Sequence, residues 1–382
     1  MCNDIIYEVG NYEDYLKQKE AYEKTWMHDS LPYYEKVCNE IETWLQRVPF
    51  TEFCTEIESR VLGQPELRVF LANVFSYLLA IVNQKPLNHN AIICAPSGCG
   101  KTETYRALKD YFHRYIPALE VYIFDISQMT ATGFRGIDAA DLVSRFTKHA
   151  EEEVHNIKAV GLVFMDEFDK EVEPRYTVHG ENISRQEQGN LLTVIEGSSM
   201  LFSNSRQNVY VDTNYTMFVG LGSFSALRDQ GKEKTYPIGM GVEKEWEACE
   251  NEKNEYRMLK REDFLEAGAS AELVGRFPLI CNYVELSEEI VRKVILKTCE
   301  NIKESMLLNE LTLSEDMMQI LLDSANTEFG CRMFDAKIRT LVMKGYTEAL
   351  VEPGHVREIL KIHVNSPEDI CFKWEKEANS ER

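Results

Sequence analysis

One short segment holds residue types that together can bind a polyphosphate: Ala95-Pro96-Ser97-Gly98-Cys99-Gly100-Lys101-Thr102. Glycine lets backbone N–H groups wrap phosphate oxygens, lysine supplies a cation for the outer phosphates, and the threonine hydroxyl can bind a divalent metal ion. This pattern is a Walker A loop in which Ala95 replaces the usual first glycine, a position that mainly serves the turn. The alternative is an ordinary glycine-rich turn. We predict that these residues, with the adjacent Glu103, bind ATP.

A carboxylate pair, Asp166-Glu167, directly follows the apolar run 161–165. This arrangement is typical of a Walker B strand. Its first carboxylate holds Mg²⁺ through the water shell of the ion, and the second orients and polarises the attacking water. We therefore predict a Mg²⁺ site formed by Thr102 and Asp166, with Lys101 and Glu167 as catalytic groups. A pair that only caps the following helix is the alternative.

No other catalytic pattern competes with these two segments. The chain contains no His-Glu-x-x-His motif and no Gly-x-Ser-x-Gly motif. Its ten cysteines include no Cys-x-x-Cys pair, so neither zinc-ligand spacing nor a disulfide framework is supported.

The bulk composition limits the class of protein and its partners. The chain has 382 residues, 44% of them hydrophobic, which is enough for two or three globular domains of about 100 to 200 residues each. Its 42 Lys and Arg against 63 Asp and Glu give a net charge of -21, which repels a phosphate backbone and argues against nucleic acid as a partner. A basic patch inside a pore escapes this argument. We expect a cytoplasmic protein, because no basic segment followed by an apolar stretch begins the chain and no apolar run could span a membrane.

Short apolar runs and helical patterns alternate through the first part of the chain. The apolar runs that predict buried strands are 91–94, 121–124, 161–165 and 216–219. Because helical stretches separate them, we expect a parallel sheet that is buried on both faces and flanked by helices. After Pro278 the pattern is helical, with one further strand expected over 358–364.

These patterns predict an α/β fold with a second, smaller domain that is mainly helical. The expected divisions are a helical N-terminal appendage over 1–55, a large ATPase domain over 56–283, a small helical domain over 284–365 and a charged tail over 366–382.

Several motifs, in the right order, resemble the AAA+ unfoldases of the ClpX and HslU type over about 61–364, most of the chain. Besides the Walker A loop, the matching segments are Val61-Leu62-Gly63-Gln64, Asp166-Glu167-Phe168-Asp169-Lys170, Met217-Phe218-Val219-Gly220-Leu221-Gly222-Ser223-Phe224, Val274-Gly275-Arg276-Phe277-Pro278 and Gly330-Cys331-Arg332. The resemblance implies a P-loop AAA+ ATPase core with a small helical lid domain, assembled as a homohexameric ring.

The resemblance also implies roles outside the Walker segments. Val61 and Leu62 would contact adenine, and Arg276 would be an arginine finger that a neighbouring subunit supplies to neutralise charge on the departing phosphate. Arg332 would be a sensor that reports nucleotide state to the small domain, or else a structural salt-bridge partner. Ser223 would sense the γ-phosphate, or else would simply end its strand.

The segment Gly133-Phe134-Arg135-Gly136 resembles the family's pore loop, in which an aromatic and an aliphatic residue between two glycines grip a polypeptide. Glycine supplies the backbone freedom that such a loop needs. Arg135 replaces the aliphatic residue, so we expect a more basic pore with Phe134 as the gripping residue. A turn with Phe134 packed in the core is the alternative.

Two departures from the family concern its partners. No four-cysteine zinc module precedes Val61, so the family's zinc-module recognition is not carried over. The tripeptide Ile238-Gly239-Met240 resembles the one that docks these unfoldases onto a Clp-type peptidase, but Met240 replaces phenylalanine. Peptidase docking and a plain surface loop are both consistent with this segment.

Together these features predict an ATP-dependent unfoldase, a chaperone that threads polypeptide through a ring pore and can feed a Clp-type peptidase. The alternative from another class is a nucleic-acid remodelling motor or helicase loader. The acidic charge and Phe134 argue against that alternative, and Arg135 argues for it. A nucleotide-gated interaction module without hydrolysis is a third interpretation, and the filled catalytic positions argue against it.

Overall fold

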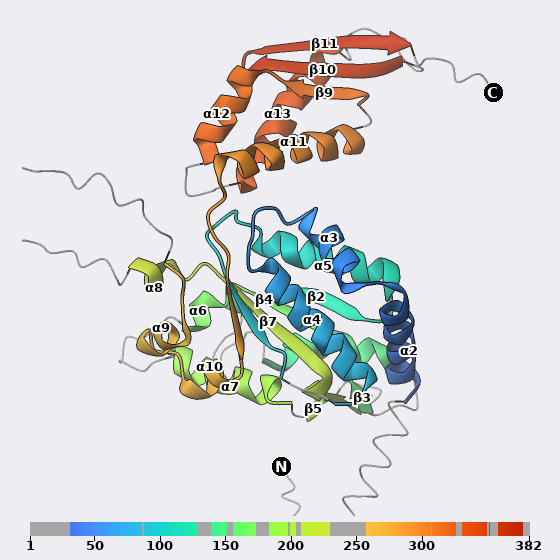
Figure 1. The fold of residues 1–382 in the computed structure, drawn as a ribbon, viewed down its shortest axis with the longest axis vertical. Helices are drawn as coiled ribbons and strands as arrows, with labels where there is room; N and C mark the ends of the chain where they lie inside the picture. Colours follow the sequence, from blue (N-terminus) through green and yellow to red (C-terminus); the bar gives the residue numbers. More distant parts are fainter. Residues whose placement is uncertain are drawn as a thin grey trace, which may run out of the picture.

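The computed structural model describes most of the chain (Figure 1). The described residues are 31–85, 88–128, 139–150, 156–172, 183–197, 199–203, 208–229, 257–306, 308–325, 331–349, 351 and 358–376. The predicted pore residues Phe134 and Arg135 and the predicted docking residues Ile238, Gly239 and Met240 lie outside these ranges. Within the ranges, no helix combines the length and the apolar character needed to cross a bilayer.

A five-stranded parallel sheet forms the centre of the larger part of the molecule. Its strands follow the order β2-β4-β7-β1-β8, and each neighbouring pair is parallel. The strand bounds are β1 Ala91–Cys94, β2 Glu120–Asp125, β4 Gly161–Asp166, β7 Thr216–Gly222 and β8 Leu279–Asn282. The four strands predicted from apolar runs, and the parallel sheet, are confirmed.

The fifth strand, β8, corrects the expectation of a purely helical pattern after Pro278. Leu279–Asn282 pairs in parallel with β1 and so forms one edge of the sheet. A run of four residues is too short to be distinguished from the start of a helix by its pattern alone.

Both faces of this sheet are buried. Successive side chains of a strand point to opposite sides, so each strand contributes to both cores. Ile93 and Phe164 belong to the core on one face, and Ile92 and Val163 belong to the core on the other. The first face is covered by α2 Leu31–Arg47, α3 Phe50–Glu58, α4 Leu67–Val82 and α5 Lys101–Tyr115 (Figure 1). The second is covered by η2 Ala139–His149, α6 Asp169–Val172, α7 Ile183–Ile195, α8 Ser225–Asp229, α9 Arg261–Glu266 and α10 Ala271–Gly275.

The two N-terminal helices α2 and α3 pack into the first core. Trp44 of α2 is 3% exposed, lies edge-on to Phe53 of α3 and Phe112 of α5, and donates its indole N–H to the Tyr111 hydroxyl at 3.1 Å. The boundary expected at residue 55 therefore falls inside α3, whose apolar side chains are part of the same core as α5.

Smaller elements complete the larger part. A three-stranded sheet with the order β3-β6-β5 consists of β3 Asn156–Lys158, β6 Asn208–Asp212 and β5 Ser199–Ser203. Two single 3₁₀ turns are η1 Ile126–Gln128 and η3 Thr213–Tyr215.

The C-terminal part has its own core and its own sheet. Its elements are α11 Glu288–Ser305, β9 Glu310–Leu313, α12 Glu315–Ala325, α13 Arg332–Ala349, β10 Glu358–Ser366 and β11 Asp369–Lys376. The three strands form a sheet in the order β11-β10-β9 that covers the helices (Figure 1). The helical pattern expected after Pro278 corresponds to α11, α12 and α13, and the strand predicted over 358–364 is present as β10.

The charged tail expected over 366–382 is replaced, as far as Lys376, by the strand β11. This strand pairs antiparallel with β10 and places Trp374 opposite Leu360. The charges of β11 alternate with Ile370, Phe372 and Trp374, so the segment is an amphipathic edge strand rather than a solvated tail.

Candidate functional site

The phosphate loop, residues 95–102, connects the buried strand β1 to helix α5. Gly100 caps α5 in the left-handed region with φ of 96°, where residues with a Cβ are strained. A Cβ at Gly100 would also come within 3.3 Å of the Val61 side chain. Glycine is therefore favoured here, and the N-terminus of α5 that follows it is the kind of helix start that suits an anion.

Lys101 is held inside the phosphate loop. Its ammonium donates hydrogen bonds to the Ala95 carbonyl at 2.5 Å and to the Pro96 carbonyl at 3.1 Å. The residue is only 7% exposed. The positive charge is thus fixed at the inner side of the loop, where the outer phosphates of a nucleotide would meet it.

A cleft of about 700 Å³ opens beside this loop, between the larger part and the C-terminal part. One side, which we call the phosphate-loop wall, consists of Val61, Leu62, Pro96, Gly98, Cys99, Gly100, Lys101, Thr102, Glu103 and Asp166. The other side, which we call the helical wall, consists of Leu286, Val294, Lys297, Thr298, Asn301, Cys331 and Asp335. Arg60 and Arg106 also line the cleft.

The structure brings most of the predicted nucleotide-binding residues together in the phosphate-loop wall. Ser97 and Ser223 are not among the lining residues. Arg332 begins α13 next to Cys331, which does line the cleft. The roles assigned to these residues from the sequence remain predictions.

The two predicted Mg²⁺ residues both line the cleft. β4, which ends at Asp166, and β1, which leads into the phosphate loop, are the two neighbours of β7. Their carboxyl ends therefore meet at the same edge of the sheet. Thr102 and Asp166 offer a hydroxyl and a carboxylate oxygen, the hard donors that Mg²⁺ prefers, and Mg²⁺ usually needs only one or two carboxylates besides substrate phosphates. These residues fit a Mg²⁺ ion.

Glu167, the predicted water-orienting residue, follows Asp166 in a strained conformation. Its φ is 59°, in the left-handed region that residues with a Cβ rarely adopt and that is enriched at functional sites. Its N–H donates to the Asp166 carboxylate at 3.1 Å. Its carboxylate pairs with the Lys170 ammonium, which raises the pKa of Lys170.

Asp169 ties the turn after β4 to the end of β7. Its carboxylate accepts hydrogen bonds from the Ser223 hydroxyl at 2.7 Å, the Ser223 N–H at 3.1 Å and the Phe224 N–H at 3.2 Å. Asp169 lies in the segment 166–170 that resembles the family, and no role was predicted for it. Ser223, the predicted sensor, is thus bound to the Walker B turn.

Arg276, the predicted arginine finger, is not among the residues that line the cleft of its own chain. Its guanidinium pairs with the Glu196 carboxylate at 2.6 Å, and both side chains are 43% exposed. An arginine that acts on a neighbouring subunit must be accessible, and this one is.

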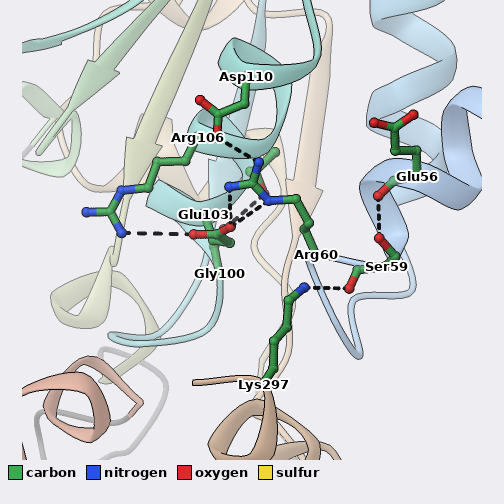
Figure 2. A network of polar contacts seen from close by, with 9 residues as sticks. Glu56, Ser59, Arg60, Gly100, Glu103, Arg106, Asp110 and Lys297 are labelled. Carbon is green, nitrogen blue, oxygen red and sulfur yellow. Dashed lines mark hydrogen bonds and ion pairs between the residues drawn. The ribbon is translucent and has the colours of Figure 1, made fainter. Parts of the chain in front are cut away.

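At the edge of the cleft, the predicted residue Glu103 belongs to a network of charged residues whose other members were not predicted from the sequence (Figure 2). The Arg60 guanidinium lies between two carboxylates of α5, at 2.9 Å from Glu103 and 2.7 Å from Asp110. From the helical wall, Lys297 donates to the Ser59 carbonyl at 2.7 Å. Arg60 could have been suspected because it precedes Val61, whereas Lys297 has the pattern of an ordinary helical surface residue.

Burial governs the ionisation of several side chains in the cleft. It raises the pKa of the Cys99 thiol, and it raises the pKa of Cys331 to about 11. It lowers the pKa of Lys297. The pKa of Arg60 is raised overall because Asp110 and Glu103 outweigh the opposing effect of its burial. The two thiols are therefore neutral near pH 7.

Comparisons with known proteins agree with this geometry. Residues 87–280 match the family model described as AAA domain (Cdc48 subfamily). Proteins named ATP-dependent Clp protease ATP-binding subunit ClpX from two strains of Porphyromonas gingivalis are 23% identical to this chain over 316 residues, covering 75% of this chain and 74% of theirs. The protein of the same name from Treponema denticola is 25% identical over 264 residues, covering 63% of this chain and 61% of its own.

Proposed function

Because the chain belongs to the AAA domain family and is an ATPase, we propose that it uses ATP hydrolysis to unfold polypeptides and thread them through a ring of its own copies. The observation that carries the proposal is the cleft, in which the phosphate loop and Asp166 face the helices of the C-terminal part. Hydrolysis in such a cleft can move the helical wall relative to the phosphate-loop wall. Threading requires a movement of this kind.

The residues of the phosphate-loop wall support binding and hydrolysis of ATP. The Gly100 turn and the start of α5 suit the phosphates, and Lys101 supplies a fixed positive charge. Thr102 and Asp166 would hold Mg²⁺, which when bound neutralises charge on the phosphate oxygens. Val61 and Leu62, at the same wall, offer apolar contact for adenine.

Glu167 would orient the attacking water and accept its proton as the bond between the γ-phosphorus and the leaving oxygen breaks. To do so its carboxylate must leave Lys170, and both partners of this pair are partly exposed, at 44% and 51%. Exposed pairs of this kind contribute about 0.2–1 kcal/mol, so their separation costs little.

Assembly into a ring, most simply a homohexamer, would bring Arg276 of one subunit to the cleft of the next. Arg276 would first exchange its partner Glu196 for the departing phosphate, whose charge it would neutralise. Arg332, at the start of α13, would carry the nucleotide state to the C-terminal part, and Ser223 would sense it through the Walker B turn. Hydrolysis would then depend on assembly.

The polypeptide part of the proposal depends on similarity. The relatives are named as ATP-binding subunits of a protease, and the segment 133–136 resembles a polypeptide-gripping pore loop. Phe134 and Arg135 would line the pore, and Ile238, Gly239 and Met240 would dock a Clp-type peptidase. We further propose a functional division near residue 284, close to the start of α11.

The test is ATP turnover by the purified protein with Mg²⁺, with and without a denatured protein, and separately with DNA. We expect denatured protein to raise turnover and Glu167→Gln to lower it by about 100-fold or more, the usual contribution of such a group. Phe134→Ala should keep turnover but lose unfolding, whereas Phe372→Ala, at an exposed phenylalanine of β11, should keep both. Stimulation by DNA, in a salt-dependent manner and without stimulation by protein, would instead assign the remodelling function.

A further inference from the structure

The side chain of Gln64 lies buried between the phosphate loop and the start of the C-terminal part. It is 8% exposed. Its Oε1 accepts a hydrogen bond from the Val284 N–H at 2.8 Å, and its Nε2 donates to the Val284 carbonyl and to the Cys99 carbonyl, both at 3.0 Å. One side chain thus uses both amide donors and its acceptor on two distant backbone segments.

Those two segments are the ones that nucleotide binding would have to connect. Cys99 belongs to the phosphate loop and precedes Gly100. Val284 belongs to the linker, residues 283–287, that joins β8 to α11. The Gln64 amide therefore bonds both to the part of the loop that would surround the phosphates and to the linker. Among the described residues, this linker is the only connection along the chain from the sheet to α11.

The linker is fixed to the same region by a second contact. The Tyr283 hydroxyl lies 3.0 Å from the Thr104 hydroxyl, in the first turn of α5, and both residues are 0% exposed. The Tyr283 N–H donates to the Cys94 carbonyl at 2.8 Å, at the end of β1. The first residue of the linker, Tyr283, is thus bound to the phosphate-loop side. Gln64 holds the next residue, Val284, from which the linker continues toward α11.

The turn that carries Gln64 is also pressed against the C-terminal part. Gly63 has φ of 73°, and a Cβ there would lie 2.9 Å from Ile290 of α11 and 3.3 Å from Leu286 of the linker. One residue before Arg60, the Ser59 carbonyl accepts the hydrogen bond from Lys297 of α11 (Figure 2). A displacement of α11 therefore acts directly on the turn.

We propose that Gln64 is a positioning residue that couples the phosphate loop to the linker, so that nucleotide bound at the loop orders the start of the C-terminal part. This role rests on the proposed nucleotide site, and it would transmit nucleotide binding at that site to the C-terminal part. Movement of the Cys99 carbonyl would redirect the Gln64 amide, and the amide holds Val284 by both its N–H and its carbonyl. Cys99 and Val284 would then change together.

A merely structural Gln64 would make a different prediction. Its loss would then lower stability and leave the response to nucleotide intact wherever the protein still folds. The two roles separate in hydrogen–deuterium exchange of the full chain with and without ADP, followed in peptides covering 95–100 and 283–290. No polypeptide substrate is involved in this measurement.

At ADP about 100 times its Kd, local opening of a coupled segment is suppressed by up to about 100-fold. We expect this slowing in both segments of the wild-type protein. In Gln64→Met, which keeps the shape and loses the hydrogen bonds, the loop should still slow while the linker slows less than about threefold. ADP affinity should fall by about twofold to tenfold, the usual effect of losing one hydrogen bond, because only the bond to the Cys99 carbonyl reaches the phosphate loop.

The control is Glu66→Gln, two residues along the same turn, where the carboxylate accepts a hydrogen bond from the Asn282 N–H of β8. This variant should keep the slowing of both segments. If Gln64→Met does not fold, Gln64→Glu retains the acceptor for Val284 and removes both donors, and it should show the same uncoupling.

The outcomes are distinct. Equal slowing of the linker in wild type and in a folded Gln64 variant overturns the coupling role. A wild-type protein whose loop slows but whose linker does not overturns it as well, and leaves the nucleotide site standing. A wild-type protein in which neither segment responds to ADP overturns the proposed nucleotide site and the coupling together.

Discussion

The phosphate-loop wall and the helical wall of the cleft are held in place by different kinds of contact. In the first, Lys101 and Cys99 are each 7% exposed, and Lys101 is bonded to two loop carbonyls. In the second, Lys297 of α11 reaches across to the Ser59 carbonyl in an exposed contact at 2.7 Å, and Asp335 pairs at 3.4 Å with Arg339 of its own helix, with side chains 59% and 44% exposed. The first wall is built into a core, and the second is attached to it by a linker and a few exposed contacts.

This difference divides the work of the site. Groups that are already fixed lose little entropy when they meet a charged ligand, so a pre-organised wall gives strong, oriented binding. Exposed polar contacts are each worth about 0–1 kcal/mol, so a wall held by them can shift when the ligand changes. We infer that the phosphate-loop wall binds and the helical wall responds, which predicts large effects of substitution on one side and small effects on the other.

The largest effect is expected at Lys101. In Lys101→Met the buried side chain keeps its length and loses its charge, and losing one partner of a buried charge pair costs roughly 2–5 kcal/mol. ATP affinity measured by calorimetry should therefore fall at least about 30-fold. Lys109→Met, two turns along α5 at an exposed position, should bind ATP as the wild type does. Similar affinities for the two variants would show that Lys101 does not face the phosphates.

A smaller effect is expected at Gly100. Gly100→Ala places a Cβ in the left-handed region, at a cost of about 1–2 kcal/mol, and presses it against Val61. This cost should lower the free energy of unfolding. If the loop relaxes to avoid the strain, part or all of the cost should appear as weaker ATP binding instead. Denaturant unfolding with and without ATP measures both parts.

Gly189 provides the matched control for this backbone argument. It lies inside α7, and a Cβ there would meet nothing within 4 Å. Because glycine in a helix interior is destabilising by roughly 0.5–1 kcal/mol relative to alanine, Gly189→Ala should raise the free energy of unfolding. If Gly100→Ala raises the free energy of unfolding as Gly189→Ala is expected to do, the strain assigned to Gly100 is wrong.

The two walls also differ in how far the sequence predicts them. The phosphate-loop wall consists mostly of one continuous motif, together with Asp166. A motif of this fixed spacing after an apolar run predicts a phosphate-binding loop between a strand and a helix. The strands β1, β2, β4 and β7 were predictable for the same reason, since each is an uninterrupted apolar run. Lys297 and Asp335, by contrast, lie on amphipathic helices whose polar faces resemble any solvated surface. They become site residues only because the linker folds α11 back over the phosphate loop.

Two of the strands that sequence reasoning missed, β8 and β11, have a common physical cause. β8 and β11 are defined by their partners: Leu279–Asn282 is a strand because β1 has a free edge, and Asp369–Lys376 is a strand because β10 does. β-pairing of this kind depends on tertiary context more than on local preference. Gln64 belongs to the same class, because its three bonds reach residues 35 and 220 positions away.

The smallest effect is expected at Lys297, on the helical wall. Lys297→Met removes the hydrogen bond to the Ser59 carbonyl. It also removes the ammonium charge of a lysine whose pKa is already lowered by burial. Because a partly exposed contact is worth up to about 1 kcal/mol, ATP affinity should change by less than about fivefold. The change should instead appear in the exchange rates of α11 amides, which the lost contact leaves freer to open. Lys293→Met, one turn earlier at an exposed pair with Glu289, should alter neither quantity. A loss of affinity at Lys297 as large as that at Lys101 would mean that the helical wall binds the phosphates directly, and the division between a binding wall and a responding wall would have to be abandoned.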